Sequence, residues 1–213
     1  MASTINASTT STTGLVQTAD GSGILQLQSD GITALTVNAN ANVTVSNSLF
    51  VSGSGVQPLV SGTSQNTTSG TSIDFTSIPS WVRRITVMFR GVSTNGTSFG
   101  LVQLGTSSGI TTSGYLGAGG FYVNASSSFV NNATTGICFG LGEALRVIHG
   151  HVIFTLLDSN TWVASGAFGY SNAAGAGSCG GSVTLSGTLT QVRITTVNGT
   201  DTFDAGSVNI LYE

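Results

Sequence analysis

Two histidines and a few carboxylates are the residues of this sequence whose types and spacing could do chemistry. His149 and His151 would lie on the same face of a strand, where they could share a metal ion or line a polar seam. A third ligand at matching spacing is absent, so we favour an interface or a half-buried strand pair. Asp201 and Asp204 could present two carboxylates to calcium, but the stretch lacks the alternating acids and final glutamate of a calcium loop. We expect a solvated or turn-capping role for both.

Catalysis has little support in the sequence. No nucleophile elbow, phosphate loop or zinc-protease motif is present. A glycosidase would need a second carboxylate beside Glu143, which stands alone among glycine and apolar residues. Cys138 and Cys179 lack the spacing of metal ligands or of a redox motif, so they are either two free thiols or one incidental bridge. We therefore expect no enzyme activity, no cofactor and no bound metal, with a polysaccharide-degrading spike as a distant alternative.

Aromatic side chains offer a different chemistry, because an aromatic face matches the apolar C–H face of a pyranose ring. Tyr115, Phe121 and Tyr122 are set among glycines, and we expect them at an exposed surface where they could contact a glycan. Trp81 opens a strand and is predicted to be a buried corner residue. Core packing is also the expectation for Trp162.

These residues belong to a region patterned as strands throughout. From Ile73 onward apolar residues alternate with polar ones, and the longest alternating run is Val147 to Leu157. Asn95-Gly96 and Asn198-Gly199 are hairpin-turn signals that follow two of the runs. About eight to ten short strands at this spacing predict an all-β fold, an antiparallel β-sandwich or jelly roll. No helical period appears.

An alternating stretch of another kind, Leu25 to Val51, lies nearer the start of the chain. Its odd positions are apolar or small and its even positions are mostly polar. One extended chain cannot bury such a stripe against itself, so it must fold back at Asp30-Gly31 and near Asn38, or meet an identical stripe from a neighbouring chain. We interpret it as an oligomer stem, whose apolar residues are Leu25, Leu27, Leu35, Val37, Val43, Val45, Leu49 and Val51.

Four segments follow from these patterns. Residues 1–20 are a polar tract without a period and are predicted to be a flexible anchor arm, with Ile5, Leu15 and Val16 among small hydroxyl residues. Residues 21–56 form the β-rich stem. Residues 57–70 have the composition of a linker. Residues 71–213 form the sandwich, which we call the knob.

Composition restricts the partners. Charged residues make up 6% of the chain, lysine is absent, and the net charge is −3, so nucleic acid is a poor partner. Ser, Thr, Asn and Gly supply a neutral, hydrogen-bonding exterior of the kind found on extracellular and virion β proteins. No apolar run approaches the ~20 residues of a membrane helix, and no secretory signal is visible. We expect no membrane insertion.

Three stretches carry a resemblance to a known group. They are GLVQTADGSGILQLQSDGITALTVNANANV at 14–43, SGTSIDFTSIPSWVRRITVMFRGVSTNGTS at 69–98 and TLTQVRITTVNGTDTFDAGSVNILYE at 188–213. They resemble small virion surface proteins of tailed bacteriophages, which are usually labelled tail-fibre or decoration proteins. The resemblance implies a homotrimer with an extended attachment region and a distal β knob.

Two functions are expected on this basis. The first is a capsid decoration, cement or head-fibre protein of the virion surface, whose arm docks on the shell through Ile5, Leu15 and Val16 while the knob projects. The alternative is a tail-fibre tip, a receptor-binding protein that recognises host surface polysaccharide. The length of the chain favours the first, since a fibre that spans from a tail to a host would normally be longer.

Overall fold

The computed structural model describes residues 21–22, 24–29, 31–40, 42–45, 50–51, 54–55, 57–123 and 127–213. The chain divides into two compact units, Met1–Val56 and Gln57–Glu213, and each is described by itself. All regular structure in the described residues is β-strand, which confirms the all-β class. Over those residues, no helix is long and apolar enough to cross a membrane.

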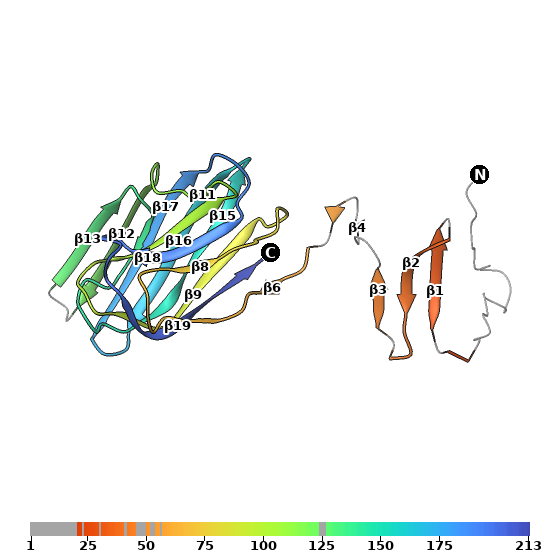
Figure 1. The fold of residues 1–213 in the computed structure, drawn as a ribbon, viewed down its shortest axis with the longest axis horizontal. Helices are drawn as coiled ribbons and strands as arrows, with labels where there is room; N and C mark the ends of the chain where they lie inside the picture. The colour runs from red at the N-terminus through yellow and green to blue at the C-terminus, as the bar shows by residue number, and fades with distance from the viewer. Residues whose placement is uncertain are drawn as a thin grey trace, which may run out of the picture. The chain divides into compact units, whose positions relative to one another are not determined.

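The first unit contains a three-stranded antiparallel sheet of β1 (Leu25–Ser29), β2 (Ile32–Val37) and β3 (Val43–Val45), and a pair formed by β4 (Phe50–Val51) and β5 (Ser54–Gly55) (Figure 1). Gly31 has a positive φ of 73° in the turn between β1 and β2. In the next turn, Asn38 Oδ1 accepts hydrogen bonds from the backbone N–H groups of Asn40 and Asn42. The stretch therefore folds back at both places that its sequence indicated.

The second unit is built from two antiparallel sheets. The nine-stranded sheet has the spatial order β13 (Ser127–Ala133), β12 (Leu116–Val123), β17 (Gly175–Thr184), β16 (Thr161–Tyr170), β15 (Ile148–Asp158), β9 (Arg84–Thr94), β19 (Phe203–Tyr212) and β6 (Val60–Ser61), with β7 (Gln65–Asn66) also on β19. The five-stranded sheet has the order β11 (Gly109–Ile110), β10 (Gly100–Thr106), β18 (Gln191–Thr196) and β8 (Ile73–Phe75), with β14 (Ile137–Phe139) on β10.

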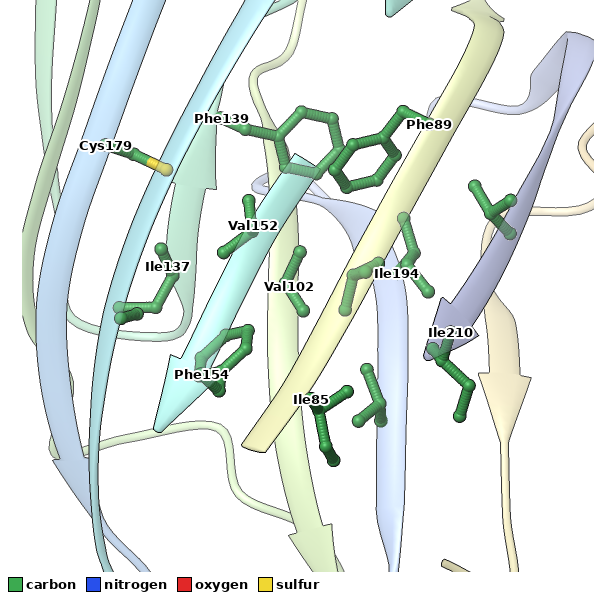
Figure 2. Close-up of a cluster of buried hydrophobic side chains, with 14 of the residues drawn as sticks. Ile85, Phe89, Val102, Ile137, Phe139, Val152, Phe154, Cys179, Ile194 and Ile210 are labelled. Atoms are coloured by element: carbon green, nitrogen blue, oxygen red, sulfur yellow. The ribbon is translucent and has the colours of Figure 1, made fainter. Parts of the chain in front are cut away.

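The two sheets bury one hydrophobic core between them, as a β-sandwich does. Figure 2 shows Phe89 of β9 and Phe154 of β15 in the large sheet facing Val102 of β10 and Ile194 of β18 in the small one. The ring centroids of Phe89 and Phe139 are 4.5 Å apart. Each such side chain contributes about 1.5–3 kcal/mol by leaving water. The inward residues are the alternate positions that the sequence marked as apolar.

Two local predictions are confirmed by these strands. The longest predicted run, 147–157, is β15 displaced by one residue, Ile148–Asp158. Asn95-Gly96 lies between β9 and β10, and Asn198-Gly199 lies between β18 and β19.

The expectation of a linker over residues 57–70 is wrong. Its residues form β6 and β7, which pair with β19. Thr67 is fully buried, and its N–H and hydroxyl donate to Gly206 O at 2.9 Å and Ala205 O at 2.7 Å. Edge pairing is made by backbone groups, so it needs no apolar period in the sequence. The polar stretch is part of the sandwich and covers the edge of β19.

Candidate functional site

The sheet of the first unit has one apolar face. Leu35 of β2 lies opposite Leu27 of β1 and Val45 of β3. Val37 lies opposite Leu25 and Val43 in the next row on the same face. The face carries six of the predicted stem residues in two rows of three. The opposite face carries Gln26, Thr36 and Thr44.

This apolar face has no covering layer in the described residues. Leu25 is 43% exposed, Leu27 48% and Val43 61%, while the other three side chains are half-buried. A three-stranded sheet stabilises itself by burying one hydrophobic face, and the described residues of the first unit leave this one largely exposed. Of the remaining predicted stem residues, Val51 belongs to β4 and Leu49 lies outside the described residues, as do Ile5, Leu15 and Val16 of the arm.

The predicted glycan contacts divide into one exposed residue and two buried ones. Tyr122 is 71% exposed, whereas Tyr115 and Phe121 are core residues, so the expectation of exposure was wrong for these two. The glycines around them belong to strand β12 and to the chain just before it. Phe121 and Tyr122 point to opposite faces of the sheet because successive side chains of a strand alternate between its two faces. The Tyr115 hydroxyl accepts a hydrogen bond from Leu104 N at 2.7 Å. Burial raises the pKa of Tyr115 to about 12, against a smaller lowering by the Leu104 backbone.

The two tryptophans have structural positions. Trp162 is 2% exposed, which confirms core packing. Trp81 is half-buried, less than expected, and its ring centroid is 5.8 Å from that of Tyr212. Tyr212 is itself only partly buried at the edge of the core, so Trp81 packs against the rim of the sandwich.

Asp201 has the turn-capping role that was expected. Its Oδ2 accepts from Ser98 N at 2.8 Å and its Oδ1 from Asn198 Nδ2 at 2.6 Å, so both oxygens are engaged by donors. Asp204 is exposed on β19. No three His, Cys, Asp or Glu residues of the described ranges are grouped so that they could hold a metal ion.

Both histidines are exposed on β15 and are not half-buried. The His149 Nε2 atom lies 3.2 Å from Ser171 Oγ. Arg90 of β9 lies directly opposite His149, and sequence reasoning did not single it out. Alternation within each strand could have placed both residues on an outer face, but the pairing between strands could not be found from the sequence.

The remaining candidate residues are engaged inside the fold. Cys138 and Cys179 are buried, and Figure 2 shows Cys179 among the side chains of the core. Burial, with a smaller effect of Cys138, raises the pKa of Cys179 to about 12. The carboxylate of Glu143 pairs with the guanidinium of Arg146 rather than with a second carboxylate. That guanidinium lies 4.9 Å from the centroid of the Tyr170 ring.

Two of the hollows on the sandwich are lined in part by an arginine. One, of about 440 Å³, includes Arg83 and Trp162 in its lining, and the guanidinium of Arg83 donates to the Ser80 and Val82 carbonyls. The other, of about 330 Å³, includes Arg193, whose Nε and Nη2 each donate to the Asp74 carboxylate at 2.7 Å. The guanidinium groups of both arginines are thus bonded to other groups of the fold.

No protein-family model matches the chain, and neither a curated protein nor a solved structure matches it. A β-sandwich hosts many unrelated functions, so the fold by itself assigns none. The features left to carry function are the apolar face of β1–β3 and the exposed outer face of the nine-stranded sheet.

Proposed function

We propose that the protein is a structural protein of the bacteriophage virion surface, a homotrimeric capsid decoration or head-fibre protein held by its N-terminal region, with the sandwich projecting. The observation that carries the proposal is the apolar face of β1–β3, which the described residues leave largely exposed, in a unit distinct from the sandwich. The neutral, lysine-free composition and the resemblance of three stretches to phage virion proteins support the same assignment.

A second copy of the same face is the best cover for it. Both rows are aliphatic and carry no charge, so identical copies meet without burying an unpaired polar group. At ~25 cal/mol per Å² of apolar surface removed from water, six such side chains per chain give a strong drive to associate. A closed cyclic assembly places the rows inside and the Gln26, Thr36 and Thr44 side outside. The number of copies, three, is proposed from the resemblance to phage virion proteins, which implies a homotrimer.

Attachment to the shell is assigned to the arm, residues 1–20. Ile5, Leu15 and Val16 supply apolar plugs between residues that add backbone hydrogen bonds to a preformed surface. Ordering such a segment costs binding energy, and three arms on one trimer recover affinity through effective concentration.

Two measurements test the proposal. Light scattering at micromolar concentration should give three times the chain mass of 21.4 kDa, and a monomer mass contradicts the trimer. Antibody against the sandwich, imaged on virions, should decorate the head.

A tail-fibre tip that binds host surface glycan is the second candidate. The observation that favours it is Tyr122, which is 71% exposed on the outer face of the nine-stranded sheet. Antibody bound at the tail in the same images, together with a signal on a glycan array, would replace the first candidate by this one.

A further inference from the structure

A row of paired residues crosses the outer face of the nine-stranded sheet. Tyr122 of β12 lies opposite Ala176 of β17, which lies opposite Gly169 of β16. Gly169 lies opposite His149 of β15, and His149 lies opposite Arg90 of β9. The row has an aromatic ring at one side, two basic side chains at the other, and small residues between them.

A double glycine bulge directly follows Arg90 in β9. In β9, Phe89 faces the core and Arg90, the next residue, is exposed on the outer face, as alternation along a strand requires. Val92 faces the core again because an extra residue intervenes between it and Arg90. Gly91 is the extra residue: its φ is 66°, and the pairing with β15 skips from Val92 to Arg90. The pairing with β19 skips at Gly206, where a Cβ would lie 2.3 Å from Gly91 O. Only glycine fits there, and the bulge returns Val92 to the core after the outward-facing Arg90.

The register partners of Arg90 include no acidic side chain. Arg90 is exposed and forms no ion pair among the residues the structure describes. Its register partners are His149 on β15 and Ser207 on β19. His151, two residues further along β15, is also exposed and lies opposite Met88. None of these neighbours is acidic, on a chain whose net charge is −3.

We propose that Arg90, His149 and His151 bind an oxyanion group of an acidic polysaccharide, whose chain crosses the small-residue floor to stack a sugar ring on Tyr122. The planar guanidinium matches a carboxylate or a sulfate, and the imidazoles add donors. Tyr122 and His149 are three strands apart, about 14 Å at the usual strand spacing, which leaves room for a short length of sugar chain. The proposal holds for either location on the virion.

A polysaccharide suits this surface better than an acidic protein does. Ala176, Gly169 and Ala167 present a floor with little side-chain relief, and protein interfaces rely on aromatic and aliphatic anchors in pockets. The floor leaves a polymer of hydroxyl-bearing rings free to lie flat. Affinity per site is therefore modest, and several copies on one virion raise it by avidity.

The test is calorimetric titration of the full-length protein with polygalacturonate oligomers, sulfated dextran, neutral dextran and poly-glutamate. Polygalacturonate or sulfated dextran should bind, more weakly at high salt, and the stronger of the two identifies the anionic group. Arg90→Gln should lower that affinity about tenfold or more, because charge-assisted hydrogen bonds are lost. Tyr122→Ala should weaken it as well.

Arg83→Gln is the matched control, since Arg83 is also exposed, forms no ion pair in the described part of the chain, and precedes β9. It makes the same charge change and should leave affinity within about twofold. Equal weakening by both arginine variants overturns the site, and so does no binding by the wild-type protein. If neutral dextran binds as tightly as the acidic polymers do, the site does not recognise an anionic group. If poly-glutamate binds as tightly as polygalacturonate does, the partner is an acidic protein rather than a polysaccharide. Unchanged melting of Arg90→Gln separates lost binding from lost folding.

Discussion

The carboxylate of Asp201 accepts a hydrogen bond from the backbone N–H of Ser98, 103 residues earlier in the chain. Asn198 Nδ2 donates to the other oxygen of the same carboxylate at 2.6 Å. A Cβ at Gly96 would lie 2.1 Å from this carboxylate, so glycine leaves the space that Asp201 fills. Two turns that look independent in the sequence are therefore one cross-linked unit. It joins the β9–β10 and β18–β19 connections, and thus both sheets.

Asp201→Ala should lower the free energy of unfolding by about 1.5–3 kcal/mol, the usual worth of hydrogen bonds to a charged group. Asp204→Ala is the control, because this exposed carboxylate should change stability by no more than about 0.5 kcal/mol. Denaturant midpoints compare the two variants. Equal midpoints would show that the cross-link contributes nothing.

Replacing Val43 and Val45 together by Asp should dissociate or misfold the first unit, because both side chains lie on its apolar face. Thr36→Asp with Thr44→Asp adds the same charge on the opposite face and should leave the assembly intact. Light scattering reports the mass of each variant. A valine variant that keeps the wild-type mass, or a threonine variant that dissociates equally, would place the interface elsewhere.

A fragment of residues 57–213 should fold by itself and melt cooperatively, because it contains both sheets and the whole core. A fragment of residues 71–213 lacks β6, β7 and the buried Thr67, so it should melt at lower temperature and expose the edge of β19. Calorimetry and aggregation measurements compare the two. Identical melting would mean that residues 57–70 add no stability despite their pairing.

The sandwich should lose stability above about pH 9, because burial keeps acidic groups protonated. Burial raises the pKa of Tyr115 from 10.0 to about 12 and that of Cys179 from 9.0 to about 12. The unfolded chain releases these protons first, so the free energy of unfolding is undiminished below pH 9 and falls from there toward pH 12.

Urea titrations at several pH values measure this loss. Tyr115→Phe should reduce the alkaline decline while lowering stability at pH 7, because the hydrogen bond from Leu104 N is lost. Tyr122→Phe changes an exposed ring and should leave the alkaline decline as it is. A wild-type protein equally stable at pH 7 and pH 11 contradicts the prediction.

The alternation of apolar and polar residues, together with the turn residues, was enough to predict the sandwich from the sequence, because alternating residues such as Ile85 and Val87 bury one face of a strand. The glycines around Tyr115 and Phe121 led to the wrong prediction that these two residues are exposed. The glycines of β12 and β17 are strand residues that give space to neighbours: a Cβ at Gly177 would lie 2.5 Å from the Phe168 ring. In a sequence, glycines that allow such close packing within strands cannot be told from the glycines of a loop.

Pairing between strands is the part of the candidate site that the sequence could not supply. Nothing local to Arg90 or His149 says that they lie opposite each other, since this depends on the register of two strands that are far apart in the sequence. The bulge at Gly91 shifts that register by a residue. The apolar rows of β1–β3 were predictable because their strands are consecutive and joined by short turns.

The pairing of residues 60–67 with β19 has a mechanical consequence. Val60 lies opposite Tyr212 and Asn66 opposite Ser207, so this segment lies along most of the neighbouring strand. Ladder hydrogen bonds are perpendicular to the strands, and a pull on residue 57 directed along β6 loads them in shear. They then share the force and must break together, whereas a pull across the sheet would open them one at a time. A polar, weakly patterned stretch of chain thus holds the beginning of the second unit to β19 against a pull along the strand.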